Sequence, residues 1–343
     1  MRNASPPGRT PRSVGLAALL AVLAAGCDLS PTVDVETPAF EERLAVRSVL
    51  TLGAVPTVRV GLARDPFAVT AEGVVRPTPT DVTVTLWRDG ALVETLPLRS
   101  QTCYTQSSGQ CNAETGLYET ERSGPYECGA YRGELPLTPG PYTLRAERAG
   151  LPAAEATVVV PEAPDATFSG RLEGDGYAFD LTVRDPDEAP GTAFGLSLLR
   201  EFDAFETSVC AVGGPRDTTI VLGTPSRYTT SFGTLDPTLR AAAGELDGTF
   251  NLIVFDDATF QNAEGAFSMV APFEGTTGRS GTGRFTLQVA RLSPVLYDYL
   301  RETVFALDAP TPFDEPSNLP SNVTGGYGHV GTVATREILT DTQ

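Results

Sequence analysis

The stretch DVTVTLWRDGALVETL, residues 81–96, predicts two short antiparallel strands joined by a tight turn. Its first half contains VTVTL, in which apolar and hydroxylated side chains alternate with the period of a strand that has one buried face. Asp89-Gly90 then supplies the kind of residue pair that a two-residue hairpin turn favours, because its central positions need a positive φ. This hairpin indicates a β-sheet protein.

Similar strand and turn signals extend on both sides of the hairpin, over residues 39–160. The later stretch LTPGPYTLRAERAGLPAAEATVVV reads as turn, strand, turn and strand. The chain is rich in turn formers, with 34 Gly and 28 Pro that show no repeat period. We therefore expect an N-terminal immunoglobulin-like or transthyretin-like β-sandwich over residues 39–160, followed by a linker at 161–166.

A second β domain is expected over residues 167–292. The stretches YAFDLTV and RFTLQVARL each place apolar side chains on one face of a strand. The period changes at Ser293-Pro294, a favourable N-cap and first-turn pair, after which apolar residues recur every three to four positions. The prediction is an all-β chain whose second β-sandwich or barrel-like domain carries one helix (293–308) and an extended Pro- and Gly-rich tail (309–343).

The N-terminus has the form of a secretory signal for a lipoprotein. Residues 1–26 combine Arg residues with a short apolar run that leads through small residues to Cys27. That run is too short for a mature membrane-spanning helix. LAAGC resembles a bacterial lipobox, so Cys27 is the expected lipid attachment site, and residues 27–38 form a polar tether.

The remaining cysteines fit an exported protein with disulfides. Cys103, Cys111, Cys128 and Cys210 are even in number, and pairs spaced as in zinc sites are absent from the sequence. Their pairing stays open among the connectivities that four cysteines allow. We favour a local bridge from Cys103 to Cys111, which would close the polar segment YTQSSGQ.

The segment GGYGHVG, residues 325–331, matches the glycine spacing of a dinucleotide-binding loop. The remaining sequence is too short for the helix and the strand that such a site requires after the loop, so no cofactor is expected. We interpret the segment as a turn in a tail that packs on the second domain or docks on a partner, with Tyr327 and His329 as partner contacts. The net charge of −18 argues against a nucleic-acid partner.

Catalytic and metal motifs are weak in this sequence. The single histidine leaves little for a Ser-His-Asp hydrolase, and no G-x-S-x-G elbow occurs. Asp185, Asp187 and Glu188 form a weak calcium candidate, for which a solvated acidic turn is the favoured interpretation. We therefore expect no metal and no catalytic residue.

Several stretches together point to one protein family. They are the cysteine motif, ERLAVRSVLTLGAVPTVRVGLARDPF, TPTDVTVTL, GLYE with PLTPGPYTLRAE, and LSPVLYDYLRE with PFDEPSNLPSNVTGGYG. They resemble the outer-membrane lipoproteins of the domain of unknown function 4249 family, over nearly the whole mature chain. The sequence departs from that pattern at His329, where an aromatic residue is more common, and in its extra cysteines.

The resemblance implies a role in the envelope of Bacteroidetes-type bacteria, where such genes often lie beside TonB-dependent outer-membrane receptors. The expected protein is a non-catalytic, lipid-anchored accessory or ligand-capture partner of such a transporter, in the outer membrane and facing the surface. Asp28, directly after Cys27, leaves retention in the inner membrane open as the alternative. A secreted hydrolase whose acidic pair is not identifiable and a purely structural or adhesion module are the alternatives.

Overall fold

β-strands dominate the structure, a computed structural model. It describes residues 41–63, 78–112, 114–115, 117–174, 176–185, 192–212, 214–230, 232–234, 252–260, 264–272, 279–306 and 320–342. Within these ranges the strands form three sheets, and the expectation of an all-β chain with a C-terminal helix is confirmed at this level.

The largest sheet has the order β12-β11-β16-β17-β1-β2-β6-β5, with β14 paired to β11. Its strands are β1 (Leu44–Thr51), β2 (Thr57–Leu62), β5 (Leu98–Cys111), β6 (Tyr118–Arg132), β11 (Ala193–Ala211), β12 (Gly214–Thr230), β14 (Ile253–Asp256), β16 (Arg279–Leu292) and β17 (Tyr327–Asp341).

Two smaller sheets accompany it. One has the order β4-β3-β7-β8 and consists of β3 (Thr83–Arg88), β4 (Ala91–Leu96), β7 (Gly140–Glu147) and β8 (Ala154–Val160). The other has the order β13-β15-β10-β9 and consists of β9 (Asp165–Glu173), β10 (Gly176–Arg184), β13 (Gly233–Thr234) and β15 (Glu264–Pro272). The helices among the described residues are the 3-10 helix η1 (Asp257–Thr259) and the α-helix α3 (Pro294–Ala306).

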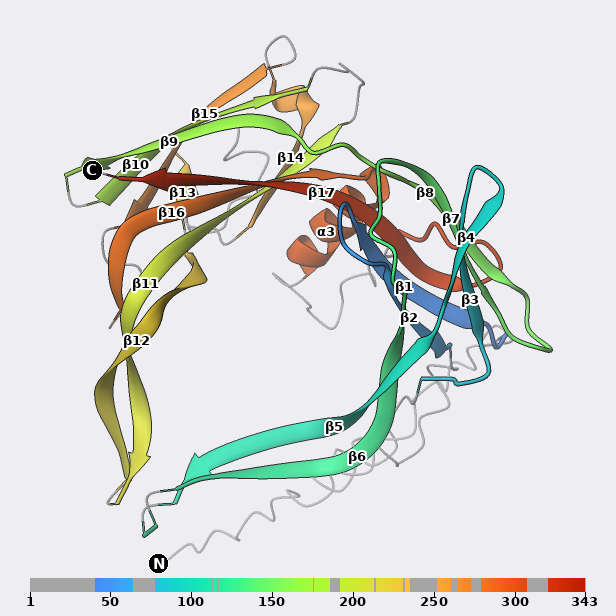
Figure 1. Cartoon of the computed structure of the whole chain (residues 1–343), viewed down its shortest axis with the longest axis horizontal. Coiled ribbons are helices and arrows are strands. Elements are labelled where there is room, and N and C mark those ends of the chain that lie inside the picture. The colour runs from blue at the N-terminus through green and yellow to red at the C-terminus, as the bar shows by residue number, and fades with distance from the viewer. Residues whose placement is uncertain are drawn as a thin grey trace, which may run out of the picture. The chain divides into compact units, whose positions relative to one another are not determined.

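Strand β17 corrects the interpretation of residues 309–343 as an extended tail. It pairs with β1 in parallel and with β16 in antiparallel orientation, so it lies inside the large sheet (Figure 1). GGYGHVG is therefore not simply a turn, because residues from Tyr327 onward belong to this strand. The backbone N–H and C=O groups of a strand inside a sheet bond to a neighbouring strand on each edge. In a surface tail the same groups would bond to water.

The two larger of the three hydrophobic cores in the described residues lie against different parts of the large sheet. The first joins the β4-β3-β7-β8 sheet to β1, β2 and β17, with Val84, Leu144 and Val330 at most 1% exposed. The second joins the β13-β15-β10-β9 sheet to β11, β14 and β16, with Phe179 and Leu287 fully buried. The division into domains at residues 161–166 stays a prediction.

The local signals in the sequence are confirmed. Asp89 (φ 51°) and Gly90 (φ 77°) form the turn between β3 and β4, as the hairpin pattern predicted. Helix α3 begins directly after Ser293, whose carbonyl accepts the first helical hydrogen bond from Tyr297 N at 3.0 Å. The Ser293 Oγ accepts a bond from Thr332 N at 3.0 Å, which fixes the start of the helix to β17.

The glycines of the 325–331 segment allow close packing around β17. Gly328 has φ 106°, and a Cβ added there would lie in contact with the carbonyl oxygen of Val46 on β1. A Cβ added at Gly331 would lie 2.8 Å from the Cβ of Leu296 on α3. The glycines at these positions therefore allow β1 and α3 to pack closely against β17.

The disulfides differ from the local bridge that we favoured. The structure pairs Cys103 with Cys128 and Cys111 with Cys210, at Cα–Cα distances of 5.8 and 5.3 Å. Cys103 and Cys111 lie eight positions apart in the extended strand β5, which separates them by about 26 Å and excludes a bridge. The Cys111–Cys210 bond instead ties β5, at one end of the strand order, to β11 near the other end.

We expect Gly331→Ala to lower the free energy of unfolding by about 1–3 kcal/mol, because the added Cβ overpacks the interface between β17 and α3. Gly61→Ala on β2 is the matched control, since no heavy atom lies within 4 Å of the added Cβ. Its unfolding free energy should stay within about 0.5 kcal/mol of the wild type. Urea denaturation measures both values, and equal stability of the two variants would contradict the close packing at Gly331.

Peptide mapping without a reducing agent should recover cross-linked peptides containing Cys103–Cys128 and Cys111–Cys210. Loss of the second bond through Cys111→Ser with Cys210→Ser should destabilise the fold by up to about 5 kcal/mol, because a bond across 99 residues restricts the unfolded chain strongly. Recovery of a Cys103–Cys111 peptide from the native protein would overturn this pairing.

Candidate functional site

The pairing of β1 with β17 brings two chemically active side chains together. Arg47 and His329 are direct partners in the parallel register, so they lie on the same face of the sheet. Helix α3 packs on that face and adds Tyr299, whose ring stacks on the imidazole with centroids 4.1 Å apart and planes at 6°. The Nη2 of Arg47 donates a hydrogen bond to Tyr299 Oη at 2.8 Å.

His329 is buried, and its ring has no hydrogen bond to any residue that the structure describes. It is 4% exposed, and neither Nδ1 nor Nε2 has a partner among the residues that the structure describes. Burial, and then the positive charge of Arg47, lower the pKa of His329 below its ordinary value of about 6.5. The imidazole is therefore neutral at pH 7 and offers one N–H donor and one nitrogen acceptor.

These side chains line a hollow of about 580 Å³, which we call the His329 hollow. Its lining residues are Ala45, Val46, Arg47, Tyr299, Pro320, Ser321, Tyr327, Gly328 and His329. Ser321 Oγ donates to the Gly328 carbonyl at 2.7 Å, and the Asn322 side chain bonds both the N–H and the carbonyl of Val330. The chain segment before β17 is thus fixed as one wall.

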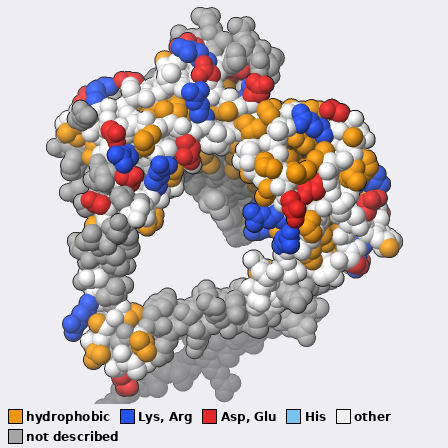
Figure 2. Space-filling model, in the orientation of Figure 1, with side chains coloured by type: hydrophobic (Ala, Val, Ile, Leu, Met, Phe, Trp, Pro, Cys, Tyr) orange, Lys and Arg blue, Asp and Glu red, His pale blue; other side chains and the backbone are white. Residues whose placement is uncertain are grey.

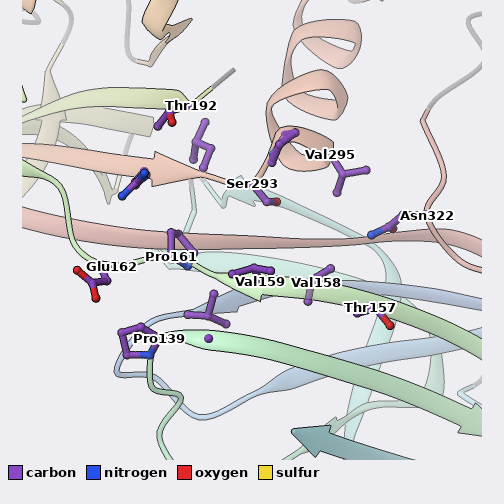
Figure 3. Close-up of a pocket in the computed structure, with 15 residues that line it drawn as sticks. Pro139, Thr157, Val158, Val159, Pro161, Glu162, Thr192, Ser293, Val295 and Asn322 are labelled. Atoms are coloured by element: carbon purple, nitrogen blue, oxygen red, sulfur yellow. The ribbon is translucent and has the colours of Figure 1, made fainter. Parts of the chain in front are cut away.

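A larger hollow of about 830 Å³ lies where β7 and β8 meet the start of α3 (Figure 3). Its walls are mainly apolar, and include Val158, Val159 and Val295. Several of its polar side chains already have partners: Ser293 bonds Thr332, and Asn322 bonds Val330. The His329 hollow is the better candidate site because it presents a buried polar ring without partners.

The two predicted partner contacts, Tyr327 and His329, differ in their exposure to solvent. Tyr327 is 42% exposed at the rim of the His329 hollow, with the guanidinium of Arg43 5.8 Å from its ring centroid. His329 lies two residues further on the same face, but α3 covers it, so it is not a surface contact. The prediction that both side chains meet a partner needs this correction for His329.

The weak calcium candidate is not assembled in the described part of the chain. Asp185 is 2% exposed and forms an ion pair with Arg291, whose Nη2 lies 3.3 Å from its Oδ1. Asp187 and Glu188 lie outside the described residues. Within the described ranges, no group of three His, Cys, Asp or Glu side chains could hold a metal ion.

Cys27, the predicted lipid attachment site, also lies outside the described residues. No helix in the ranges given above has the length and apolar character that crossing a membrane requires.

The sequence did not single out Arg47 or Tyr299 as site residues. Tyr299 belongs to the apolar stripe that predicted the helix. That stripe does not predict the contact between Tyr299 and the imidazole of His329. Arg47 stands in a short strand whose alternation predicts only exposure. The strand that pairs with it contains His329, which lies 282 positions after Arg47 in the sequence. No local sequence pattern encodes this pairing.

The described strands and the hollow define a class: an all-β, disulfide-linked protein with a preformed hollow between a sheet and a helix. The sequence profile of the family described as domain of unknown function (DUF4249) matches residues 30–338. The chain belongs to this family, as its resemblance in several stretches had indicated.

Other comparisons add no functional information. No curated protein matches the chain. Among solved structures, the Fcho1 Mu homology domain of Danio rerio with bound Eps15 peptide aligns over 88% of this chain and 95% of that chain. The sequence identity is 8% and the TM-score is 0.20, a likeness too low to support an argument.

The lowered pKa of His329 predicts a pH-dependent stability. At pH values between the pKa of His329 in the folded protein and about 6.5, the unfolded chain binds more protons than the folded protein. The contribution of neutral His329 to the free energy of unfolding is therefore complete above about pH 6.5 and is lost as the pH falls below that value. The single histidine allows its pKa to be measured directly by NMR in protein made without a histidine tag.

Urea denaturation near pH 7.5 and pH 5.5 tests this dependence of stability on pH. His329→Gln is the comparison, because the carboxylates titrate alike in both proteins. The wild type should lose more stability than His329→Gln on acidification. A histidine pKa at or above about 6.5 in the folded protein would contradict the assigned burial.

Proposed function

We propose that this protein is a non-catalytic, lipid-anchored envelope protein that captures a ligand or serves as accessory for a TonB-dependent outer-membrane transporter. The observation that carries the proposal is the His329 hollow, where a buried imidazole without hydrogen-bond partners among the described residues lies in the wall of a preformed space. A buried polar group without partners costs free energy, and a ligand that supplies the missing bond recovers it.

The two disulfides support export. Disulfides persist in oxidising compartments, and the pairs Cys103–Cys128 and Cys111–Cys210 lie at bonding geometry in the fold. The signal-like residues 1–26 and the lipobox cysteine Cys27 agree with this location. Several lipid chains on Cys27 would hold the protein firmly in the outer membrane, with the polar tether placing the β-sheets at its surface.

Binding suits the site better than catalysis. The imidazole is stacked flat against Tyr299, and no nucleophile or carboxylate lies within hydrogen-bond distance of it among the described residues. General base catalysis needs such a partner or a substrate proton in reach. The neutral ring next to a cation instead offers fixed donors for a ligand.

The surface next to the hollow offers a place for a protein partner. Tyr327 is exposed at the rim, and aromatic side chains often contribute strongly to protein interfaces. The immunoglobulin-like or transthyretin-like character of the N-terminal sandwich belongs to this proposal too, supported by the separate core around β3, β7 and β8.

The test is affinity capture of the full-length protein from gently solubilised membranes, followed by mass spectrometry of co-purifying proteins. We expect a TonB-dependent receptor to be enriched, and Cys27→Ser to move the protein from washed membranes into soluble fractions. Tyr327→Ala should weaken capture, whereas Leu172→Ala on β9, a residue 50% exposed, should not. Retention of Cys27→Ser in membranes would refute the anchor, and the absence of any receptor would refute the accessory role.

A further inference from the structure

A row of basic side chains crosses three neighbouring strands next to the His329 hollow. Arg47 on β1 is the register partner of Arg59 on β2 and of His329 on β17. Directly opposed residues in a sheet point to the same face, so the two guanidinium groups are neighbours. Figure 2 shows Arg side chains gathered where β1 and β2 lie in Figure 1.

This arrangement has no counterion in the described part of the chain. Like charges directly opposite each other in a sheet are destabilising, and neither Arg47 nor Arg59 forms an ion pair there. Other arginines do pair, such as Arg171 with Asp180 at 2.6 Å. In a chain of net charge −18, two neighbouring guanidinium groups without a counterion among the described residues point to a ligand anion.

The hydrogen-bonding groups agree with an anion. Arg47 uses one N–H for Tyr299 Oη, and a guanidinium has further donors for an oxygen acceptor. His329 lines the same hollow, and the N–H of its buried ring has no partner among the described residues. Arg47 and His329 are register partners, so a bound oxyanion beside Arg47 would also lie next to the imidazole.

The aromatic groups indicate what the anion is attached to. Tyr299 forms one wall of the hollow and Tyr327 stands at its exposed rim. Aromatic faces favour flat apolar surfaces, and offset or edge-to-face ring pairs add to the area that they bury. The volume of about 580 Å³ lies in the range of small-molecule pockets.

We propose that the His329 hollow binds a small organic anion, with its carboxylate or phosphate held by Arg47 and His329 and its ring against Tyr327. Arg59 strengthens binding through its charge, without a place in the hollow itself. The proposal rests on the proposed function as a binding protein and adds the chemical class of the ligand.

The test follows the imidazole of the only histidine, in full-length protein labelled with ¹⁵N-histidine and made without a histidine tag. The probes are benzoate, phenyl phosphate and benzamide, the last being a neutral analogue of the same shape as benzoate. We expect saturable shifts of the imidazole signals with benzoate or phenyl phosphate, at dissociation constants of about 1 mM or tighter, and the stronger of the two identifies the anionic group.

Arg47→Gln should weaken binding of that probe at least about tenfold, because a charge-assisted hydrogen bond is lost. Arg59→Gln should weaken it less. Arg216→Gln on β12 removes the same charge from another exposed site and should leave the affinity unchanged. Backbone amide spectra that overlay with the wild type show that each variant is folded.

The proposal is overturned if neither anion shifts the imidazole signals, if benzamide binds as tightly as benzoate, or if Arg47→Gln and Arg216→Gln behave alike. These outcomes are separate from the test of the accessory role. Capture of a TonB-dependent receptor with no response to the probes would refute the anion site alone, whereas probe binding without receptor capture would refute the transporter role alone.

Discussion

The pairing of β17 between β1 and β16 is the constraint on which the described structure depends. It joins the last described strand to the first, and it connects the part of the large sheet under one hydrophobic core to the part under the other. A contact between chain ends is entropically costly to form, and long-range strand pairing generally slows folding. The Cys111–Cys210 bond, near the two ends of the same strand order, restricts the unfolded chain and offsets part of that cost.

The position of β17 also explains its unusual composition. His329, Val330, Gly331 and Thr332 are buried in succession, because α3 covers one face and the first core covers the other. Such a strand cannot alternate between polar and apolar residues, and it needs glycines where the helix and β1 approach. The packing that requires Gly331 also brings Tyr299 over His329.

The same packing creates the polarity of the candidate site. Covering His329 with Tyr299 removes water from the imidazole, while the register places the charge of Arg47 beside it. Both effects favour the neutral ring, and neither supplies a hydrogen bond to it. A polar ring without partners among the described residues, held inside a stable frame, is what the proposed ligand site requires.

The sequence by itself determined the elements whose signals are local. The hairpin at Asp89-Gly90, the alternating strands around Phe179 and Leu287 and the helix start at Ser293-Pro294 depend on neighbouring residues, and all are found in the structure. Strand β17, the disulfide pairing and the meeting of Arg47 with His329 depend on residues far apart in the chain. Only tertiary structure decides these, because the partner of a strand or a cysteine is set by which surfaces pack together, and a glycine-rich segment reads as a turn until its neighbours are known.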